Sequence, residues 1–169
     1  MSERKLIPDE VRDHFSYCKD TGRITRITNP SRGPRTAGKL VDEGTCARGY
    51  RRVRLAGNPM TAHRVAWFLY HGEQPPKYID HINGDRTDNR IENLRKACHH
   101  TNLANAKISS RNKTGVKGVS WNKSGGKWMA KVDFKGTSYV AGYFDDIDEA
   151  EQAARSLRQS IHGEFTNHG

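Results

Sequence analysis

Residues 78–105 read YIDHINGDRTDNRIENLRKACHHTNLAN, and this stretch decides the local fold that we expect. The Asn-Gly-Asp sequence at residues 83–85 is a turn signal. Residues 91–95 then predict a short return strand. Residues 98–107 predict a helix that carries Asn102 back over the hairpin. The stretch therefore predicts two strands followed by one helix.

The same stretch supplies polar side chains suited to phosphodiester hydrolysis. Cleavage needs a base that deprotonates water and a cation that neutralises the charge building on the phosphate oxygens. His81 can be the base, because an imidazole titrates near neutral pH. Asp80 and Asn102 offer oxygen, the donor that Mg²⁺ and Mn²⁺ prefer, so we expect Mg²⁺ with Mn²⁺ as a substitute. Neighbours on a flat strand face opposite ways, so Asp80 and His81 can share a site only if the backbone bends there.

These residues resemble the HNH (ββα-metal) endonucleases, specifically the phage and intron homing branch. The residues that carry the resemblance are 62–67, Gly72, Pro75, 80–85, 88–95, Asn102 and Asn105. The resemblance implies that His81 is the general base and that Asp80 and Asn102 bind the metal. It also implies that Asn93 orients the loop of the active site through hydrogen bonds.

Each of these residues also has an ordinary structural explanation. An isolated Asp-His pair in a loop is usually only solvated, and Asn93 could simply cap a turn. His99 lies one turn before Asn102 on the same helical face, so it is an alternative metal ligand. Asn105 shares a face with Asn102 and is better suited to supporting the site than to ligation. The matching segments in register favour the catalytic interpretation.

The composition indicates a nucleic-acid partner. The chain has 169 residues, a formal net charge of +10 and a pI near 9.7, which suits a surface that binds phosphate. Hydrophobic residues make up 34%, which favours small domains in tandem over one large core. The sequence shows no membrane span and no signal peptide, so we expect a cytoplasmic protein, in the bacterial host of a phage. The cysteines form no Cys-x-x-Cys pair, which argues against a zinc finger.

The charge changes sign towards the C-terminus. Residues 111–136 hold seven Lys or Arg and one acid, whereas residues 137–169 hold two bases and six acids. Three short strands are predicted over residues 116–122, 127–134 and 138–144. Asp146 then predicts the N-cap of a helix, with Glu149 in capping-box register. The apolar stripe of this helix consists of Ala150, Ala153, Ala154, Leu157 and Ile161.

Residues 113–167 resemble the AP-two/ERF DNA-binding domain. The residues that carry the likeness are 116–119, 126–128, 141–144, 148–150, 153–154, Gly163 and 165–167. In that family a three-stranded sheet lies in the major groove. The resemblance implies a DNA-facing surface made of Lys117, Ser120, Asn122, Lys123, Lys127, Lys131 and Ser138. Where these residues replace arginines, we expect phosphate binding to survive and sharp base readout to weaken. Each lysine alone is more often a solvated charge.

The first sixty residues predict a small β region around a Pro/Gly/Arg-rich loop at residues 29–38. The homing branch has strands here that follow the DNA backbone. Arg51, Arg52 and Arg54 would suit that use, although a solvated strand edge explains Arg51 and Arg54 equally well.

A helix is predicted over residues 61–70, between Pro59 and Gly72. Its His63, Trp67 and His71 lie on one face. We expect them to pack against the hairpin rather than to bind a metal.

Together these features predict an α+β protein in three parts. A small N-terminal β region (1–60) contacts DNA, a ββα-metal HNH nuclease (61–110) follows, and a three-stranded antiparallel sheet packed on one helix (111–169) closes the chain. We expect a site-directed, homing-type endonuclease that acts on double-stranded DNA as a monomer or homodimer, with a nick as the monomer's product. The alternative is a DNA-binding regulator with an inactive HNH region, but Asp80, His81 and Asn102 are all present. An RNA-binding module would need an aromatic platform that this sequence lacks.

Overall fold

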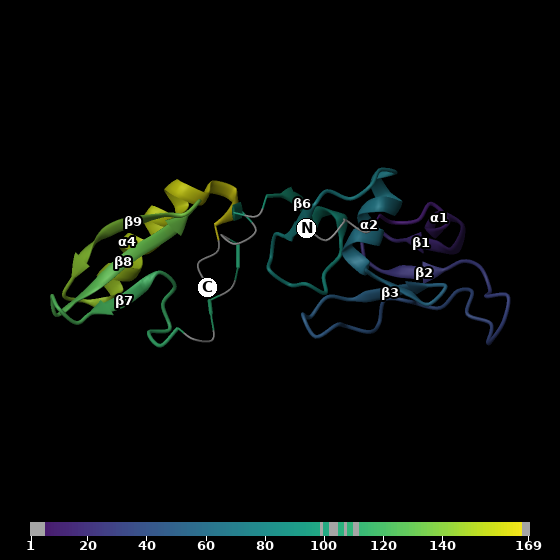
Figure 1. The fold of residues 1–169 in the computed structure, drawn as a ribbon, viewed down its shortest axis with the longest axis horizontal. Coiled ribbons are helices and arrows are strands. Elements are labelled where there is room, and N and C mark those ends of the chain that lie inside the picture. The colour runs from purple at the N-terminus through teal and green to yellow at the C-terminus, as the bar shows by residue number, and fades with distance from the viewer. Residues whose placement is uncertain (1–5, 99, 102–104, 107, 110–111, 167–169) are drawn as a thin grey trace. The chain divides into compact units, whose positions relative to one another are not determined.

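The computed structural model describes residues 6–98, 100–101, 105–106, 108–109 and 112–166. The chain divides into two compact units, Met1–Ala97 and Cys98–Gly169, and Figure 1 shows the elements of each. Both units combine α-helix with antiparallel β-sheet. The predicted α+β class is therefore confirmed.

The described residues of the first unit, 6–97, form three two-stranded antiparallel sheets and two α-helices. Its elements are α1 (Val11–His14), β1 (Phe15–Tyr17), β2 (Ile24–Arg26), β3 (Arg52–Leu55), β4 (Asn58–Thr61), α2 (Ala62–His71), β5 (Tyr78–His81), the 3-10 turn η1 (Ile91–Asn93) and β6 (Leu94–Ala97). The sheets pair β1 with β2, β3 with β4, and β5 with β6.

Helix α2 is the element around which this unit packs. One face joins Val65 and Phe68 to a core that includes Phe15, Ile24 and Val53 of the N-terminal strands. The other face joins Ala66 and Trp67 to Ile79 and Leu94 of the β5–β6 hairpin. The predicted packing of Trp67 against that hairpin is confirmed. The N-terminal strands and the hairpin are thus tied to the same helix.

The return strand of the hairpin begins later than the sequence predicted. Residues 91–93 form η1, and β6 starts at Leu94 instead of Ile91. The loop side chains explain the delay, because Asp88 pairs with Arg90 and the backbone amide of Asn93 donates to the Arg90 carbonyl. Of the helix expected over residues 98–107, His100 and Thr101 are helical, Asn105 lies in a turn, and Asn102 falls outside the described residues.

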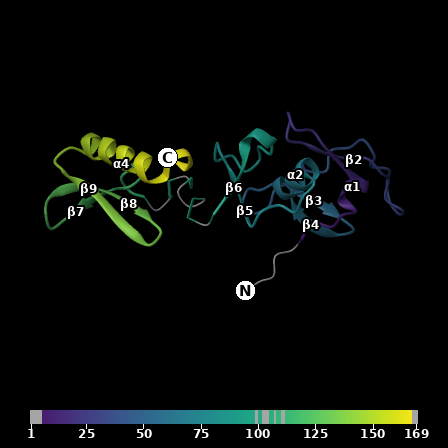
Figure 2. The ribbon, with the colours of Figure 1, turned by 90° about the horizontal axis from the view of Figure 1, so that it is seen from above.

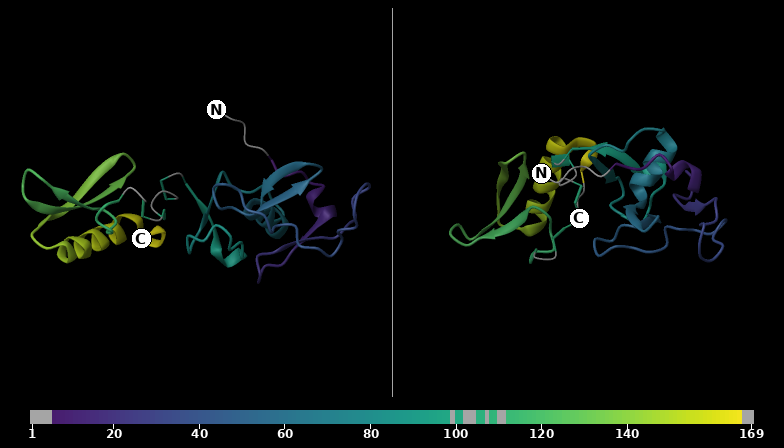
Figure 3. Two further views of the ribbon diagram at one scale, coloured as in Figure 1. Left: turned by 90° about the horizontal axis from the view of Figure 1, so that it is seen from below. Right: turned by 45° about the vertical axis from the view of Figure 1, so that its right-hand side comes forward.

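The second unit is a three-stranded antiparallel sheet with a long helix on one face. The strands β7 (Val119–Asn122), β8 (Lys127–Phe134) and β9 (Thr137–Phe144) lie in the order β7-β8-β9. Helix α4 (Ile147–His162) runs along the sheet, as Figures 2 and 3 show, and the 3-10 turn η2 (Gly163–Phe165) follows it. The predicted sheet and helix are confirmed.

Local chemistry explains the ends of these elements. Asp146 caps α4 as predicted, since its Oδ1 accepts from the backbone amides of Asp148 at 2.7 Å and Glu149 at 3.2 Å. Strand β7 begins at Val119 rather than at residue 116, because Gly118 has a φ of +79° and a Cβ there would lie 2.7 Å from the Lys131 carbonyl. None of the helices in the described part of the chain combines the length and hydrophobicity that a membrane crossing requires.

Candidate active site

Strand β5 carries the predicted Asp-His pair at its end. Asp80 lies opposite Arg95 on β6, and His81 lies opposite Leu94. The register is unbroken over all four pairs of the hairpin, so the ladder contains no bulge between Asp80 and His81, and the charge of Asp80 acts on the His81 ring. Both residues are nevertheless buried, at 5% and 4% exposure, and His63 of α2 and Tyr50 pack against the His81 ring.

The Asp80 carboxylate is held by a two-point contact. Arg95 donates from Nε at 3.0 Å and from Nη2 at 2.9 Å, both to Asp80 Oδ2. A buried carboxylate needs such a partner, because its desolvation is otherwise expensive. Arg95 had no role in our sequence interpretation. Its position directly across from an acid on the paired strand is the signal that could have revealed it.

The His81 ring is buried among three side chains from other segments. Its Nε2 lies 3.1 Å from Asn89 Oδ1, and its ring centroid lies 5.3 Å from that of His63 and 5.9 Å from that of Tyr50. Burial lowers the pKa of His81, while Asn89 and the charge of Asp80 oppose this shift. The imidazole is therefore neutral at neutral pH, the state that a general base must occupy.

His63 forms the wall behind this imidazole. Burial, reinforced by the proximity of His81 and Arg64, lowers the pKa of His63 to about 3. Its Nδ1 has no hydrogen-bond partner among the described residues. His63 thus packs as a neutral ring against Tyr50 and His81, as expected of a structural residue.

The Asn93 side chain forms hydrogen bonds with the loop that connects β5 to η1. Its Oδ1 accepts from the backbone amide of Asn83 at 3.0 Å, and its Nδ2 donates to Asn83 Oδ1 at 3.0 Å and to the Asp88 carbonyl at 2.8 Å. Arg90 in turn binds the Asp88 carboxylate and holds its pKa down at about 2. These contacts give the loop after His81 one defined conformation.

The described residues supply one candidate metal ligand, Asp80. The other predicted ligand, Asn102, and its alternative, His99, lie outside the described residues. Among the residues described, no three or more His, Cys, Asp or Glu side chains are grouped to hold a metal. One carboxylate beside a neutral imidazole fits Mg²⁺, which takes one or two protein oxygens and fills its remaining positions with water and phosphate.

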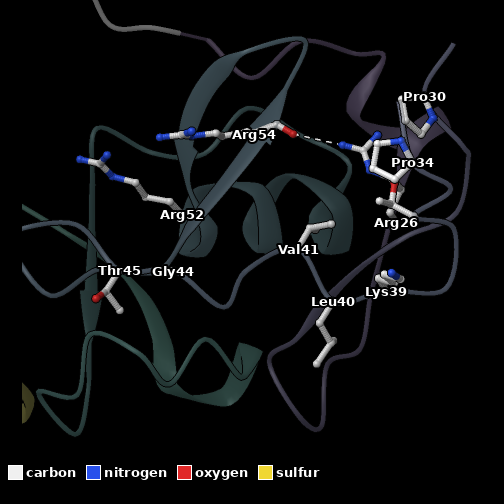
Figure 4. Close-up of a pocket in the computed structure, with 11 residues that line it drawn as sticks. Arg26, Pro30, Pro34, Lys39, Leu40, Val41, Gly44, Thr45, Arg52 and Arg54 are labelled. Carbon is white, nitrogen blue, oxygen red and sulfur yellow. Dashed lines mark hydrogen bonds between the residues drawn. The ribbon is translucent and has the colours of Figure 1, made fainter. Parts of the chain in front are cut away.

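The predicted DNA-contacting arginines of the first unit have different surroundings. Arg51 is half-buried and donates to the backbone carbonyls of Thr87 and Asp42. Arg52 and Arg54 alternate on β3 with buried residues, so both reach the solvent side of the strand. They line a cavity of about 570 Å³. Figure 4 shows these two side chains extending from the strand, with Arg26 near the far end of the cavity.

The predicted contact residues of the second unit lie on or next to its sheet. Ser120, Asn122 and Lys127 occupy positions that alternate with the buried Val119 and Ala130, on the face away from α4. Several are already engaged within the chain: Lys127 with Asp145, Lys131 with Asp133, Ser138 with Asp133, and Asn122 with the backbone of Ser124. Lys123 is exposed.

Lys117 lies just before β7, where Arg158 of α4 approaches Gly118. Lys117 Nζ donates to the Ala106 carbonyl at 2.5 Å, and burial together with the Arg158 charge lowers the Lys117 pKa to about 8. Arg158 donates to the Lys117 carbonyl and is 2% exposed. The sequence interpretation missed Arg158, although it continues the i, i+4 series of Ala150 and Ala154.

Comparisons with known proteins find two similarities to this chain. A family model described as HNH endonuclease matches residues 61–104, the range that contains α2, the β5–β6 hairpin, Asp80 and His81. Protein 3.8 of Escherichia phage T7 is 32% identical over 104 residues, which cover 61% of this chain and 85% of that protein. No solved structure matches the chain.

Proposed function

The chain belongs to the same family as Protein 3.8 of Escherichia phage T7 and carries an HNH endonuclease domain, and from this premise we propose that it is a metal-dependent DNA endonuclease. The observation that carries the proposal is a buried, neutral His81 next along β5 to a carboxylate, Asp80, that Arg95 holds in place and whose charge acts on the imidazole. A base and a cation-binding oxygen at one strand end are what phosphodiester hydrolysis requires.

The proposed reaction begins with a proton transfer to His81. The imidazole takes a proton from water, the resulting hydroxide attacks phosphorus, and the phosphorus–O3′ bond breaks. The 3′ oxygen takes a proton from solvent water and His81 releases the proton that it accepted to solvent, so the products are a 5′-phosphate and a 3′-hydroxyl. Asp80 and Asn102 would hold a divalent cation that stabilises the negative charge on the phosphate. Asn93 contributes by keeping the loop after His81 in place.

We propose double-stranded DNA as the substrate because of where the chain carries positive charge. Arg26, Lys39, Arg52 and Arg54 surround one cavity of the first unit, and their charges suit phosphate. The C-terminal sheet presents Ser120, Asn122 and Lys127 on the face that α4 leaves uncovered. We further propose that the enzyme is site-directed and of the homing type, and that its AP-two/ERF-like sheet also contacts DNA.

A nicking assay with His81→Ala tests the proposal. The purified chain should nick supercoiled DNA with Mg²⁺ or Mn²⁺, and EDTA should stop the reaction. His81→Ala should lower the rate by about 10²-fold or more while DNA binding is kept. The exposed His71 gives a matched control, since His71→Ala should keep the rate of the unchanged protein.

Two results would count against this function. Equal rates for His81→Ala and the unchanged chain would remove His81 as the base. Binding of DNA without cleavage under any Mg²⁺ or Mn²⁺ concentration would instead favour a DNA-binding regulator whose HNH region is inactive.

A further inference from the structure

Asn89 is a buried polar residue that neither accepts a proton nor binds the cation in the proposed reaction. It lies in the loop between β5 and η1 at 1% exposure. Its Nδ2 has no hydrogen-bond partner among the described residues. Burying an amide with an unpaired donor is unfavourable, and an apolar side chain of the same size would avoid the cost. The contact that the amide makes through its oxygen, Asn89 Oδ1, must therefore explain why this polar residue is buried.

That contact reaches the candidate base. Asn89 Oδ1 lies 3.1 Å from His81 Nε2. An amide oxygen can only accept a hydrogen bond, so the Nε2 facing it must carry the proton. A neutral imidazole has one protonated nitrogen, and its lone pair then lies on Nδ1.

We infer that Asn89 is a positioning residue that holds His81 in its Nε2–H tautomer and so makes Nδ1 the nitrogen that receives the proton from water. The inference rests on the proposed role of His81 as the base. Asn89 touches neither substrate nor metal in this scheme, and acts through the ring that it orients. The ring contacts of His81 with His63 and Tyr50 are compatible with either tautomer, because neither is a hydrogen bond.

The backbone around Asn89 is held in turn by β1 and the turn that follows it. The Tyr17 hydroxyl donates to the Asn89 carbonyl at 2.8 Å, and the amide of Ile91 donates to the Lys19 carbonyl at 3.4 Å. Burial raises the pKa of Tyr17, so its hydroxyl keeps the proton that it donates. A loop far along the chain is thereby anchored to β1.

Gly22 makes this approach possible. It has a φ of +69°, and a Cβ there would lie 2.4 Å from the Arg90 amide nitrogen and 2.6 Å from the Asn89 carbonyl carbon. A side chain would push the turn after β1 away from the loop. Tyr17 and Gly22 thus brace Asn89, and Asn89 orients His81. Through this series of contacts the N-terminal β region helps to orient the proposed base, His81.

The tautomer can be measured without any activity. In protein labelled with ¹⁵N-histidine, the two ring nitrogens of His81 give different chemical shifts in each tautomer, and His81→Ala identifies the signals by their loss. At about pH 8, where an imidazole is neutral, the unchanged protein should show protonated Nε2. Protonated Nδ1 in the unchanged protein would overturn the inference with no variant needed.

Two substitutions at Asn89 then separate the hydrogen bond from packing. Asn89→Leu removes the acceptor at similar volume, and should mix the two tautomers and lower kcat by about 10- to 100-fold with little change in KM. Asn89→Asp keeps an oxygen acceptor, and should keep protonated Nε2. Asn58→Leu at an exposed position is the control. An unchanged tautomer and unchanged kcat in Asn89→Leu would refute the positioning role.

Tyr17→Phe tests the brace and also serves if Asn89→Leu does not fold. Loss of one hydrogen bond should lower kcat about fivefold and broaden or shift the His81 signals, whereas Tyr70→Phe, at a half-exposed tyrosine, should change neither. Unchanged signals in Tyr17→Phe would remove the brace. Failure of the proposed function would be a separate result. A protein that never cleaves DNA, yet shows protonated Nε2 only while Asn89 is present, would confirm that Asn89 orients His81 and would contradict the proposal that the chain is an endonuclease.

Discussion

Asp80 and Arg95 face each other across the β5–β6 hairpin, and Arg95 donates from Nε and Nη2 to the same carboxylate oxygen, Asp80 Oδ2. The side chain of Asp80 is 6% exposed and that of Arg95 is 16% exposed. The arginine therefore compensates the burial of the acid and sets the direction of its carboxylate. Arg95, at the position opposite Asp80 in the hairpin, thus orients the candidate metal ligand.

Arg95→Ala should destabilise the fold, because it leaves the Asp80 carboxylate buried without its cation. The expected loss is about 3 kcal/mol in the free energy of unfolding, measured by urea denaturation at neutral pH. Lys96→Ala is the control, since its ion pair with Glu73 is exposed and should contribute less than about 1 kcal/mol. Equal stability of the two variants would show that the Asp80–Arg95 contact is not a buried ion pair in solution.

His63 should make the fold sensitive to acid. The folded protein holds His63 neutral down to a pKa of about 3, whereas the unfolded chain protonates it near 6.5. Between these values the unfolded state binds the extra proton, so stability is full above pH 6.5 and is lost as the pH falls. The contribution of one such group is at most about 1.4 kcal/mol per pH unit.

Urea denaturation at pH 7 and pH 5 measures this effect. His63→Leu should lose less stability than the unchanged protein between the two pH values, whatever its stability at pH 7. His71→Leu, at an exposed histidine, should lose as much as the unchanged protein. If His63→Leu lost as much as well, the burial of a neutral His63 would be contradicted.

Arg52→Ala and Arg54→Ala should each weaken DNA binding in a salt-dependent way. Each phosphate contact releases counterions, so each substitution should reduce the slope of log K against log salt by about 0.9 on duplex DNA. Titrations by fluorescence anisotropy at several salt concentrations measure the slope. Lys19→Ala removes an exposed charge already paired with Asp20 and should leave it unchanged. Unaltered slopes in both arginine variants would mean that DNA does not bind at Arg52 and Arg54.

Asn102 and His99 can be distinguished by the metal that supports cleavage. If Asn102 is the ligand, the site is rich in oxygen, and activity should be higher with Mg²⁺ and Mn²⁺ than with Zn²⁺. If His99 is the ligand, Zn²⁺, Co²⁺ or Ni²⁺ should be preferred. We expect Asn102→Ala to abolish cleavage across a metal titration and His99→Ala to retain it. The reverse pattern would move the metal ligand to His99.

Local patterns in the sequence determined the α+β class and several elements closely. Residues 127–134 were predicted as a strand from their alternation, and Asp146 as a helix cap from its spacing to Glu149, and both are as predicted. Such features depend on neighbours within a few residues, so the chain needs no tertiary contact to reveal them. The segment that contains Asp80 and His81 was readable for the same reason, because its motif is continuous.

Tertiary structure alone decided what surrounds that motif. His81 meets His63, Tyr50 and Asn89, which come from a helix and two loops, and Asn89 is anchored by Tyr17 at a separation of 72 residues. No periodicity links positions so far apart. Only the packing of α2 between the N-terminal strands and the β5–β6 hairpin brings them together. The motif was therefore legible from sequence, while the burial that keeps its histidine neutral and the contacts that orient it were set by the fold.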